Sequence, residues 1–351
     1  YNDCGDGGDY YKQKYAINAD ADASGQWVIS EFAQSSLSGP YLYASKLVEY
    51  LGRPAYLYRE DFLRFATNDS PDGAQQWNVY YVAEGYGGAG VVPGLAVAAD
   101  RLAVSYCYDH SSIAGTGCDL RLAVSEPGGP PDAWTISSVF AEPDEARMDY
   151  GRFSCLTVLG GRLAVACISY PVDDYSFAGE LRFAINEELD GSGEWRRYLI
   201  ERSDGGVLTG WNPSLAEVDG RPAIAYARQD WSEDWPSALK FAVNTKSDGS
   251  GYWNRFTLDS EHWVEHPSLA VVGGRPAIAY DRWSRQHGVD GMLVYGECSQ
   301  ADGTGIWNWQ VFDFRPDTAL RPSLCVLADG RPAIAYFDRI NEWLLLAVRD
   351  Y

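Results

Sequence analysis

Aromatic, arginine and histidine side chains recur in the segments between the apolar stretches of this 351-residue chain. Aromatic rings stack on sugar faces, and charged groups exchange hydrogen bonds with sugar hydroxyls, so this combination is typical of carbohydrate binding. The alternative use of such rings is to seal the ends of packed strands. The candidate ligand-binding residues are Arg147, Tyr150, Trp211, Arg228, Trp231, Trp235, Trp263, His266, Arg282 and Trp283.

A second candidate site lies near the N-terminus. Asp20, Asp22 and Ser24 place side-chain oxygens at alternate positions, and Gly25 follows at the sixth position. This spacing matches the opening of a calcium-binding loop. The alternative interpretation is an ordinary Asp- and Gly-rich turn, so calcium is an expected option and not a requirement.

Catalysis has no local signature in this chain. The sequence contains no nucleophile elbow, phosphate-binding loop or cluster with metal-ligand spacing. A pair of catalytic carboxylates drawn from different repeats would leave no such motif. The sequence therefore favours a protein without catalysis that requires no cofactor.

The charge and the cysteines limit the partners and the compartment. Acidic residues outnumber basic ones by 49 to 28, and the formal net charge of -21 repels nucleic acid and anionic membranes. No apolar stretch reaches the length of a membrane span, so we expect no membrane insertion. The seven cysteines leave at least one unpaired, and Cys107 and Cys118 flank a loop in a geometry that a disulfide can close. With the polar first residues, this predicts a processed protein that is secreted or on the cell surface.

A repeat of about 50 to 60 residues organises the chain, and such a period indicates an array of similar supersecondary units. Each unit has an apolar stretch, a turn that ends in Arg, a second apolar stretch and later an Asp-containing turn before a Trp. The arginines are Arg53, Arg101, Arg162, Arg221, Arg275 and Arg331. The tryptophans are Trp27, Trp77, Trp134, Trp195, Trp253 and Trp307.

Each unit predicts four short antiparallel strands. In one unit we expect them at 215–218, 222–226, 239–244 and 253–258, with Asp219-Gly220 as a tight hairpin between the first two. The strands are apolar on both sides, so both faces of each sheet should be covered. Repeated four-stranded sheets of this kind describe an all-β protein, a β-propeller. The variable loops would gather on one face, which is where function is expected.

The termini suggest how the ring closes. Both ends of the chain fall within a unit, so strands at about 10–33 and a segment at 321–351 would complete one blade together around five full blades at about 45–314. This predicts a single domain over 1–351 with six blades; seven blades is the alternative. Residues 344–349 form an additional third strand, which we place at an outer edge, with exchange between molecules as the other option.

The turns before the tryptophans resemble a known repeat. The segments from Asp72 to Trp77, Asp190 to Trp195, Asp248 to Trp253 and Asp302 to Trp307 are similar to the Asp-box, or BNR repeat. The resemblance implies a propeller like those of the sialidase-like superfamily. Its Asp and Trp residues would be structural. The Phe/Tyr-Arg-Ile-Pro segment usual near the start of sialidases is absent.

Together these features predict a non-catalytic, extracellular or cell-surface propeller that binds a glycan or another protein, or acts in assembly. One alternative is a sialidase-like glycoside hydrolase. That activity would need an arginine triad, for which Arg147, Arg152, Arg228, Arg282 and Arg321 are available. The other alternative is a structural subunit that polymerises through its spare terminal strand.

Overall fold

The computed structural model describes most of the chain. The described residues are 2–4, 11–18, 20, 23–35, 46–59, 62–83, 92–109, 117–128, 133–141, 148–171, 178–203, 206–230, 237–283, 291–313, 320–338, 340–341 and 343–349. They form strands and turns, and among them no helix is long and apolar enough to span a membrane.

The strands of the first half fall into consecutive antiparallel groups. The first group has β1 (Asn2–Cys4), β2 (Tyr11–Asn18) and β3 (Trp27–Ser35), and the second has β4 (Lys46–Tyr50), β5 (Arg53–Arg59), β6 (Leu63–Asn68) and β7 (Trp77–Ala83). The third has β8 (Gly94–Ala98), β9 (Arg101–Asp109), β10 (Cys118–Ser125) and β11 (Trp134–Phe140), and the fourth has β12 (Met148–Leu159), β13 (Arg162–Pro171), β14 (Glu180–Asn186) and β15 (Trp195–Arg202). A single parallel pairing between Cys118 and Asp149 links these last two groups.

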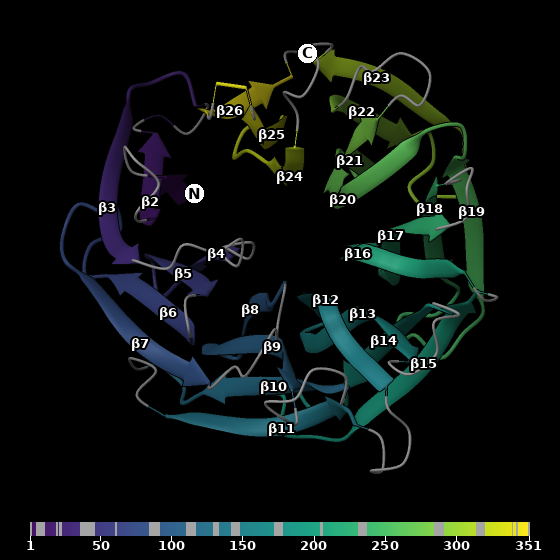
Figure 1. Cartoon of the computed structure of the whole chain (residues 1–351), viewed down its shortest axis with the longest axis horizontal. Coiled ribbons are helices and arrows are strands. Elements are labelled where there is room, and N and C mark those ends of the chain that lie inside the picture. Colours follow the sequence, from purple (N-terminus) through teal and green to yellow (C-terminus); the bar gives the residue numbers. More distant parts are fainter. Residues whose placement is uncertain are drawn as a thin grey trace.

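The second half repeats the pattern. One group has β16 (Val207–Val218), β17 (Arg221–Asp230), β18 (Ser237–Asn244) and β19 (Trp253–Asp259), and the next has β20 (Trp263–Val272), β21 (Arg275–Trp283), β22 (Met292–Cys298) and β23 (Trp307–Asp313). The last has β24 (Leu320–Val326), β25 (Pro332–Asp338) and β26 (Trp343–Val348). Figure 1 shows the groups around a common axis, with first strands such as β16 and β20 nearest the middle and last strands such as β19 on the rim. This is the architecture of a β-propeller, and we refer to each group as a blade.

Ring closure differs from our prediction. The described strands do not form a composite blade from both termini, because β26 pairs with β25 from Ala333↔Val348 to Asp338↔Trp343. In the predicted composite blade, β2 would have paired with that edge of β25. In the structure β2 pairs with β1 and β3. The two ends therefore form two separate three-stranded sheets, so six blades are not confirmed. The strand that we expected as an addition at 344–349 is β26, the third strand of its described sheet, in the position that we had predicted for β2.

Packing between adjacent blades forms the core. Leu159, Ala164 and Phe183 of one blade share a buried cluster with Ile224 and Trp253 of the next. Hydrogen bonds repeat across the next two blade boundaries. The hydroxyl of Ser214 accepts from the backbone N–H of Leu269 at 2.9 Å, and Ser268 accepts from Leu324 at 2.9 Å. The blades are thus held at a fixed angle by apolar contact and by satisfied backbone donors.

The turns before the tryptophans are tied down by their own side chains. Asp248 accepts hydrogen bonds from the backbone N–H and the hydroxyl of Ser250, at 3.0 and 2.8 Å. Asn244 donates to the carbonyl oxygens of Gly249 and Gly251. The following Trp253 is 7% exposed and meets the ring of Phe183 edge-on, at 5.3 Å between centroids. These residues are structural, as the sequence predicted.

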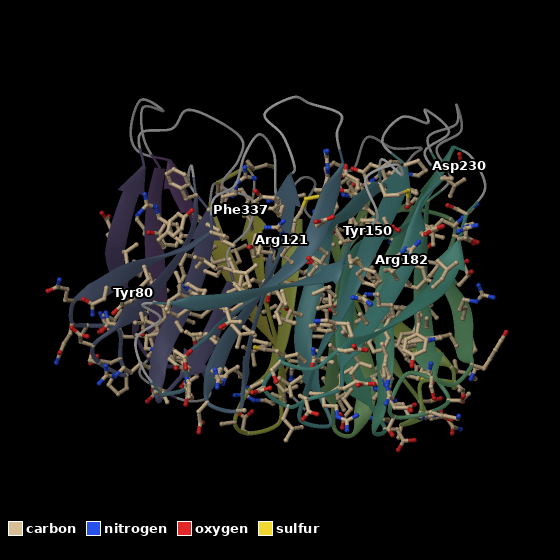
Figure 2. The ribbon with its side chains drawn as sticks, turned by 90° about the horizontal axis from the view of Figure 1, so that it is seen from below. Tyr80, Arg121, Tyr150, Arg182, Asp230 and Phe337 are labelled. Atoms are coloured by element: carbon tan, nitrogen blue, oxygen red, sulfur yellow. A yellow bond between two sulfur atoms is a disulfide. The ribbon has the colours of Figure 1, made fainter. Side chains whose placement is uncertain are left out.

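The two faces of the ring differ. Because neighbouring strands are antiparallel, the hairpin at Asp219-Gly220 and the turn at Asp248 lie on one face, and the ends of β17 and β21 lie on the other. Figure 2 shows Asp230, the last residue of β17, close to that second face. We call it the loop face.

Candidate functional site

Two tryptophans face each other at the loop-face end of one blade. Trp263 of β20 is the direct register partner of Trp283 of β21, and Glu265 is the partner of Asp281 two residues further into the sheet. Opposed residues of antiparallel strands point to the same side of the sheet, and so do residues two apart in one strand. A half-buried pair of indoles therefore lies beside a pair of carboxylates.

An irregularity in β20 adds a histidine to this cluster. The register shifts between Glu265 and Ser268, and His266 has a φ of 44°, in the left-handed region. Consecutive residues of a regular strand point to opposite faces, but a bulge redirects side chains. As a result the ligating atoms of Glu265, His266 and Asp281 all lie within 4.8 Å of one another.

The contacts within the cluster are close and largely buried. Nδ1 of His266 lies 3.1 Å from Oδ2 of Asp281 and 3.9 Å from Oε2 of Glu265. Gln229, from the end of β17 in the neighbouring blade, donates from Nε2 to Oε1 of Glu265 at 3.0 Å. Asp281 is fully buried and Gln229 is 1% exposed. The cluster thus lies at the boundary between two blades.

Electrostatics couples the three ionisable groups. Burial raises the pKa of Glu265, and the nearby charge of Asp281 adds to this, although His266 and the hydrogen bonds from Gln229 and Trp263 oppose it. For His266, burial lowers the pKa, but the charge and hydrogen bond of Asp281 and the charge of Glu265 outweigh it, so the net direction is upward. The two carboxylates therefore shift the pKa of His266 upward against the opposing effect of burial.

The structure describes four other predicted residues of the loop face. Nη2 of Arg282 is 3.8 Å from the sulfur of Met292, and the indole nitrogen of Trp283 is buried with no hydrogen-bond partner among the described residues. Arg228 is half-buried near the end of β17. The ring of Trp211 packs against Phe153 at 4.1 Å between centroids.

Tyr150 does not have the surface position we expected. It is 2% exposed, its ring stacks on Phe140 at 5.9 Å, and the guanidinium of Arg182 lies 5.3 Å from the ring centroid (Figure 2). This burial does not support Tyr150 as a ligand-binding residue. Three further candidates, Arg147, Trp231 and Trp235, lie outside the described residues.

Sequence reasoning missed Glu265, Asp281 and Gln229. A signal for Asp281 was present, since it breaks the repeat: the residue after the corresponding buried tyrosine is Ala227 in the preceding blade and Phe337 in the following one. A charged residue at a position that is apolar in the two adjacent blades indicates a function specific to this blade, because burying a charge is costly. For Glu265 and Gln229 no comparable signal stands out.

The candidate calcium turn is partly described. Asp20 and Ser24 are exposed, and Asp22 lies outside the described residues. The side chain of Asn18 organises the turn by donating to the carbonyl oxygens of Ala23 and Gly25. Glu31, twelfth when Asp20 is counted as the first position, lies in β3 with an oxygen 3.8 Å from Nζ of Lys14. Calcium binding at this turn stays a prediction.

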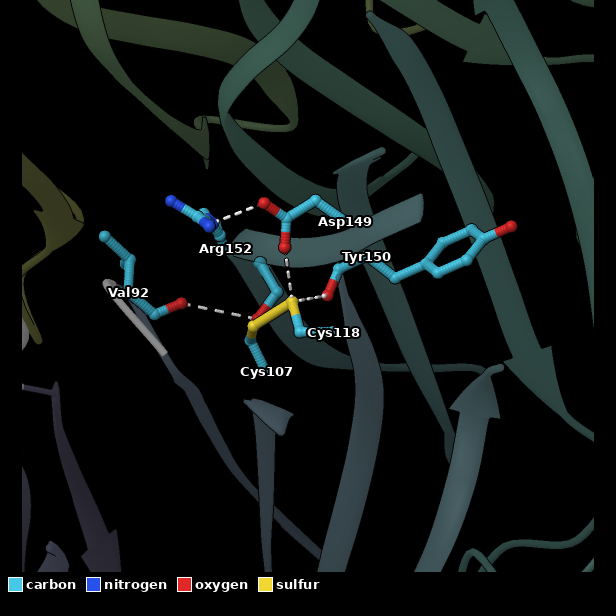
Figure 3. Close-up of a disulfide and its surroundings, with 7 residues drawn as sticks. Val92, Cys107, Cys118, Asp149, Tyr150 and Arg152 are labelled. Carbon is cyan, nitrogen blue, oxygen red and sulfur yellow. Dashed lines mark hydrogen bonds and ion pairs between the residues drawn. A yellow bond between two sulfur atoms is a disulfide. The ribbon is translucent and has the colours of Figure 1, made fainter. Parts of the chain in front are cut away.

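The predicted disulfide between Cys107 and Cys118 is present (Figure 3), with its Cα atoms 5.8 Å apart. Oδ1 of the buried Asp149 lies 2.8 Å from the sulfur of Cys118, and Oδ2 pairs with Nε of Arg152 at 2.6 Å. Because both sulfurs are used in the disulfide, this group is not available as a metal site. Among the cysteines whose side chains the structure describes, Cys155, Cys167, Cys298 and Cys325 are not in a disulfide.

Tyrosine–carboxylate pairs occur, but they are built into the blade boundaries. Tyr280 donates to Asp259 at 2.9 Å and Tyr336 donates to Asp313 at 3.1 Å, each from the second strand of one blade to the last strand of the preceding blade. Tyr226 makes the same contact with Glu201. All three tyrosines are buried. Their recurrence and burial indicate structural bonds and not nucleophiles.

Sequence comparison finds no protein-family model and no curated protein that matches this chain. Structural comparison does find similar folds. A Dyadobacter fermentans protein of unknown function has a TM-score of 0.59 at 12% identity, with 97% of this chain and 98% of that chain covered. The Penicillium chrysogenum alpha-L-arabinanase complexed with arabinobiose has a TM-score of 0.54 at 13% identity, covering 89% of this chain and 94% of that one.

A Trypanosoma rangeli sialidase in complex with sialic acid is also similar, with a TM-score of 0.53 at 12% identity. The match covers 95% of this chain but 58% of the sialidase. At these identities the likeness shows the fold alone. The chain has a propeller fold of the kind found in sialidases and arabinanases.

Proposed function

We propose that this protein binds glycans, without catalysis, at the loop-face boundary between the β16–β19 and β20–β23 blades. The observation that carries the proposal is the pair Trp263 and Trp283, opposed across two strands and next to the carboxylates of Glu265 and Asp281. Indole faces supply apolar area for sugar rings, and carboxylates accept hydrogen bonds from sugar hydroxyls.

The polar groups around the indoles suit hydroxyl recognition. The Trp283 N–H has no partner in the described part of the chain and is buried, so a ligand oxygen would reach it only after the indole rotates. Arg282 contributes nothing to this side of the sheet, because consecutive strand residues alternate in direction and its side chain interacts with Tyr280. Because two carboxylates lie in the same place, a sugar that carries its own carboxylate would be repelled there. These features favour uncharged sugars over sialosides.

The experiment is a glycan array followed by calorimetric titration of the best ligand. We expect Trp283→Ala to weaken binding by at least tenfold. Trp283→Phe should weaken binding less, because it keeps an aromatic ring and loses only the N–H. Tyr252→Ala is the matched control, since Tyr252 is 68% exposed beside the turn at Asp248 on the opposite face. Unchanged affinity in a folded Trp283→Ala variant, or no glycan bound, would refute the proposal.

Glycoside cleavage is a second candidate function. Carboxylate oxygens of Glu265 and Asp281 lie within 4.8 Å of one another, and retaining glycosidases hold their two carboxyl groups roughly 5 Å apart. The sialidase and arabinanase folds named above belong to proteins that act on glycosides, which supports testing both substrate classes. Turnover of arabinosides or sialosides that disappears in Glu265→Gln would establish this function and exclude the non-catalytic one.

The disulfide supports an oxidising location. Disulfides persist in secreted and cell-surface proteins and are rare where thiols are kept reduced. We therefore keep secretion or display at the cell surface as part of the proposal, with a glycan or an extracellular protein as partner. Mass spectrometry of alkylated protein from its native source would show the Cys107–Cys118 link, and a reduced pair there would contradict this location.

A further inference from the structure

We propose that Glu265, His266 and Asp281 form a binding site for one divalent metal ion of the Zn²⁺ or Mn²⁺ type. The two carboxylates are also those of the proposed glycan site, but the metal proposal does not rest on glycan binding. One imidazole and two carboxylates are a common donor set for these ions. Calcium fits less well, because it prefers oxygen ligands alone.

The geometry is close to that of a bound ion. Two ligands that each hold a metal at about 2.1 Å lie at most about 4.2 Å apart. Nδ1 of His266 already lies 3.1 Å from Oδ2 of Asp281 and 3.9 Å from Oε2 of Glu265. All three ligand atoms lie within 4.8 Å of one another, and a tetrahedral site with bonds of about 2.1 Å needs roughly 3.4 Å between them, so the Glu265 side chain must move inward by about 1 Å.

Charge compensation supports an ion at this position. Asp281 is fully buried, and the Glu265 side chain is 23% exposed. Two carboxylates this close together are costly to bury without a cation. His266 and the nearby Arg321 are the cations that act here in the absence of an ion, whereas a divalent ion bound by a neutral His266 would itself neutralise both carboxylates.

Groups outside the three ligands hold them in place. Gln229 donates to Oε1 of Glu265 at 3.0 Å and leaves Oε2 facing His266, and Trp263 also donates to Glu265. Hydrogen bonds that orient a carboxylate in this way are the usual support of a metal ligand, and their loss typically costs 10- to 100-fold in affinity.

The two neighbouring blades do not carry this donor set at the equivalent described positions. At the position of His266 the neighbouring blades have Asn212 and Arg321, each also with positive φ and each also followed by a proline. At the position of Asp281 they have Ala227 and Phe337. A contact needed for the scaffold recurs between blades, as the tyrosine–carboxylate bonds do. This cluster does not recur in those neighbours, which indicates a local task.

The experiment titrates Zn²⁺ and Mn²⁺ into chelator-treated, dialysed protein by calorimetry, with the paramagnetic resonance spectrum of Mn²⁺ as a direct readout. We expect one ion per chain and a higher unfolding temperature. Asp281→Asn should weaken binding by at least 100-fold, and Gln229→Ala by about tenfold. If Asp281→Asn fails to fold, the more exposed Glu265→Gln replaces it.

The matched control is Asp259→Asn, which alters a second carboxylate–imidazole pair. Oδ1 of Asp259 lies 3.0 Å from Nδ1 of His262, but Tyr280 takes the place of a third ligand. Its metal affinity should equal that of the unmodified chain. The inference is overturned if no ion binds, if Asp281→Asn binds as tightly as the unmodified chain, or if Asp259→Asn loses as much affinity. Glycan titrations in chelator test the proposed function separately.

Discussion

The phenol oxygen of Tyr280 on β21 donates a hydrogen bond of 2.9 Å to Oδ2 of Asp259 on β19, across the boundary between two blades. Equivalent bonds join Tyr226 to Glu201 and Tyr336 to Asp313. These contacts tie the second strand of one blade to the last strand of the preceding blade, where apolar packing alone would permit sliding.

Removal of this hydroxyl should destabilise the fold. Tyr280→Phe keeps the ring and its edge contact with Trp309 but loses a hydrogen bond to a carboxylate, so we expect a loss of about 1–2 kcal/mol. Urea unfolding followed by tryptophan fluorescence measures the change. Tyr252→Phe is the control, because Tyr252 is mostly exposed. Equal midpoints for the two variants would show that the bond contributes nothing.

Loss of the disulfide should have a larger effect. Cys107 and Cys118 are 11 residues apart in the sequence, and a cross-link over a loop of this size stabilises by about 2–4 kcal/mol. We expect the Cys107→Ala, Cys118→Ala double variant to unfold at correspondingly lower denaturant. Cys325→Ala changes a free and exposed cysteine and serves as the control. A double variant as stable as this control would contradict the prediction.

Two glycines separate backbone strain from steric overlap. Gly220 and Gly249 have φ of 69° and 75°, but only at Gly249 would an added Cβ meet another group, Cε1 of Phe183, at 2.4 Å. Gly249→Ala should therefore cost about 1–3 kcal/mol more than Gly220→Ala. Thermal unfolding of the two variants compares them directly. The reverse order would mean that the Phe183 ring moves aside freely.

Acid should weaken the turns before the tryptophans. The hydroxyl and then the backbone N–H of Ser250 lower the pKa of Asp248, so the folded state retains the carboxylate better than the unfolded chain does. This contribution is complete above the ordinary pKa of about 4 and is lost as the pH falls through the lower folded value. In unfolding curves between pH 6 and pH 2, Asp248→Asn should show a shallower loss of stability than the unmodified chain. Parallel curves would refute this account.

Alkali should act on the buried tyrosines. Burial raises the pKa of Tyr106 to about 12, and only part of that rise is offset by Arg121. In the unfolded chain a tyrosine ionises near pH 10, so the stabilising effect is complete below about pH 10 and is lost as the pH rises toward 12. Absorbance of phenolate in the native protein should rise later than in denatured protein. Tyr106→Phe should make stability less dependent on pH in that window.

Much of the blade structure follows from local chemistry, and the sequence was sufficient to predict it. Asp219 and Gly220 both have positive φ, as a tight two-residue hairpin requires, and Asp248 and Trp253 have the structural roles expected of them, although Trp27 is 44% exposed. The Cys107–Cys118 disulfide was predicted because its two strands are adjacent in both sequence and space. These features involve residues that are close in the sequence, so the residue types alone are sufficient to predict them.

Ring closure was decided by tertiary structure. Two segments of the third-strand type, β2 and β26, were both suited to the free edge of β25, and local pattern cannot rank them. β26 pairs with the free edge of β25 because it is nearer in the chain. Closing this short connection costs less conformational entropy than joining the two ends of the chain.

The candidate site shows the same division. The sequence by itself identified Trp263, His266, Arg282 and Trp283 as chemically useful residues, but it did not show that they meet or that Glu265 and Asp281 lie among them. The cluster depends on a bulge that redirects His266 and on Gln229 from another blade. The sequence by itself showed which residue types are available. Their convergence required the pairing of strands and the packing of blades, because strand pairing and blade packing are long-range interactions that local spacing does not encode.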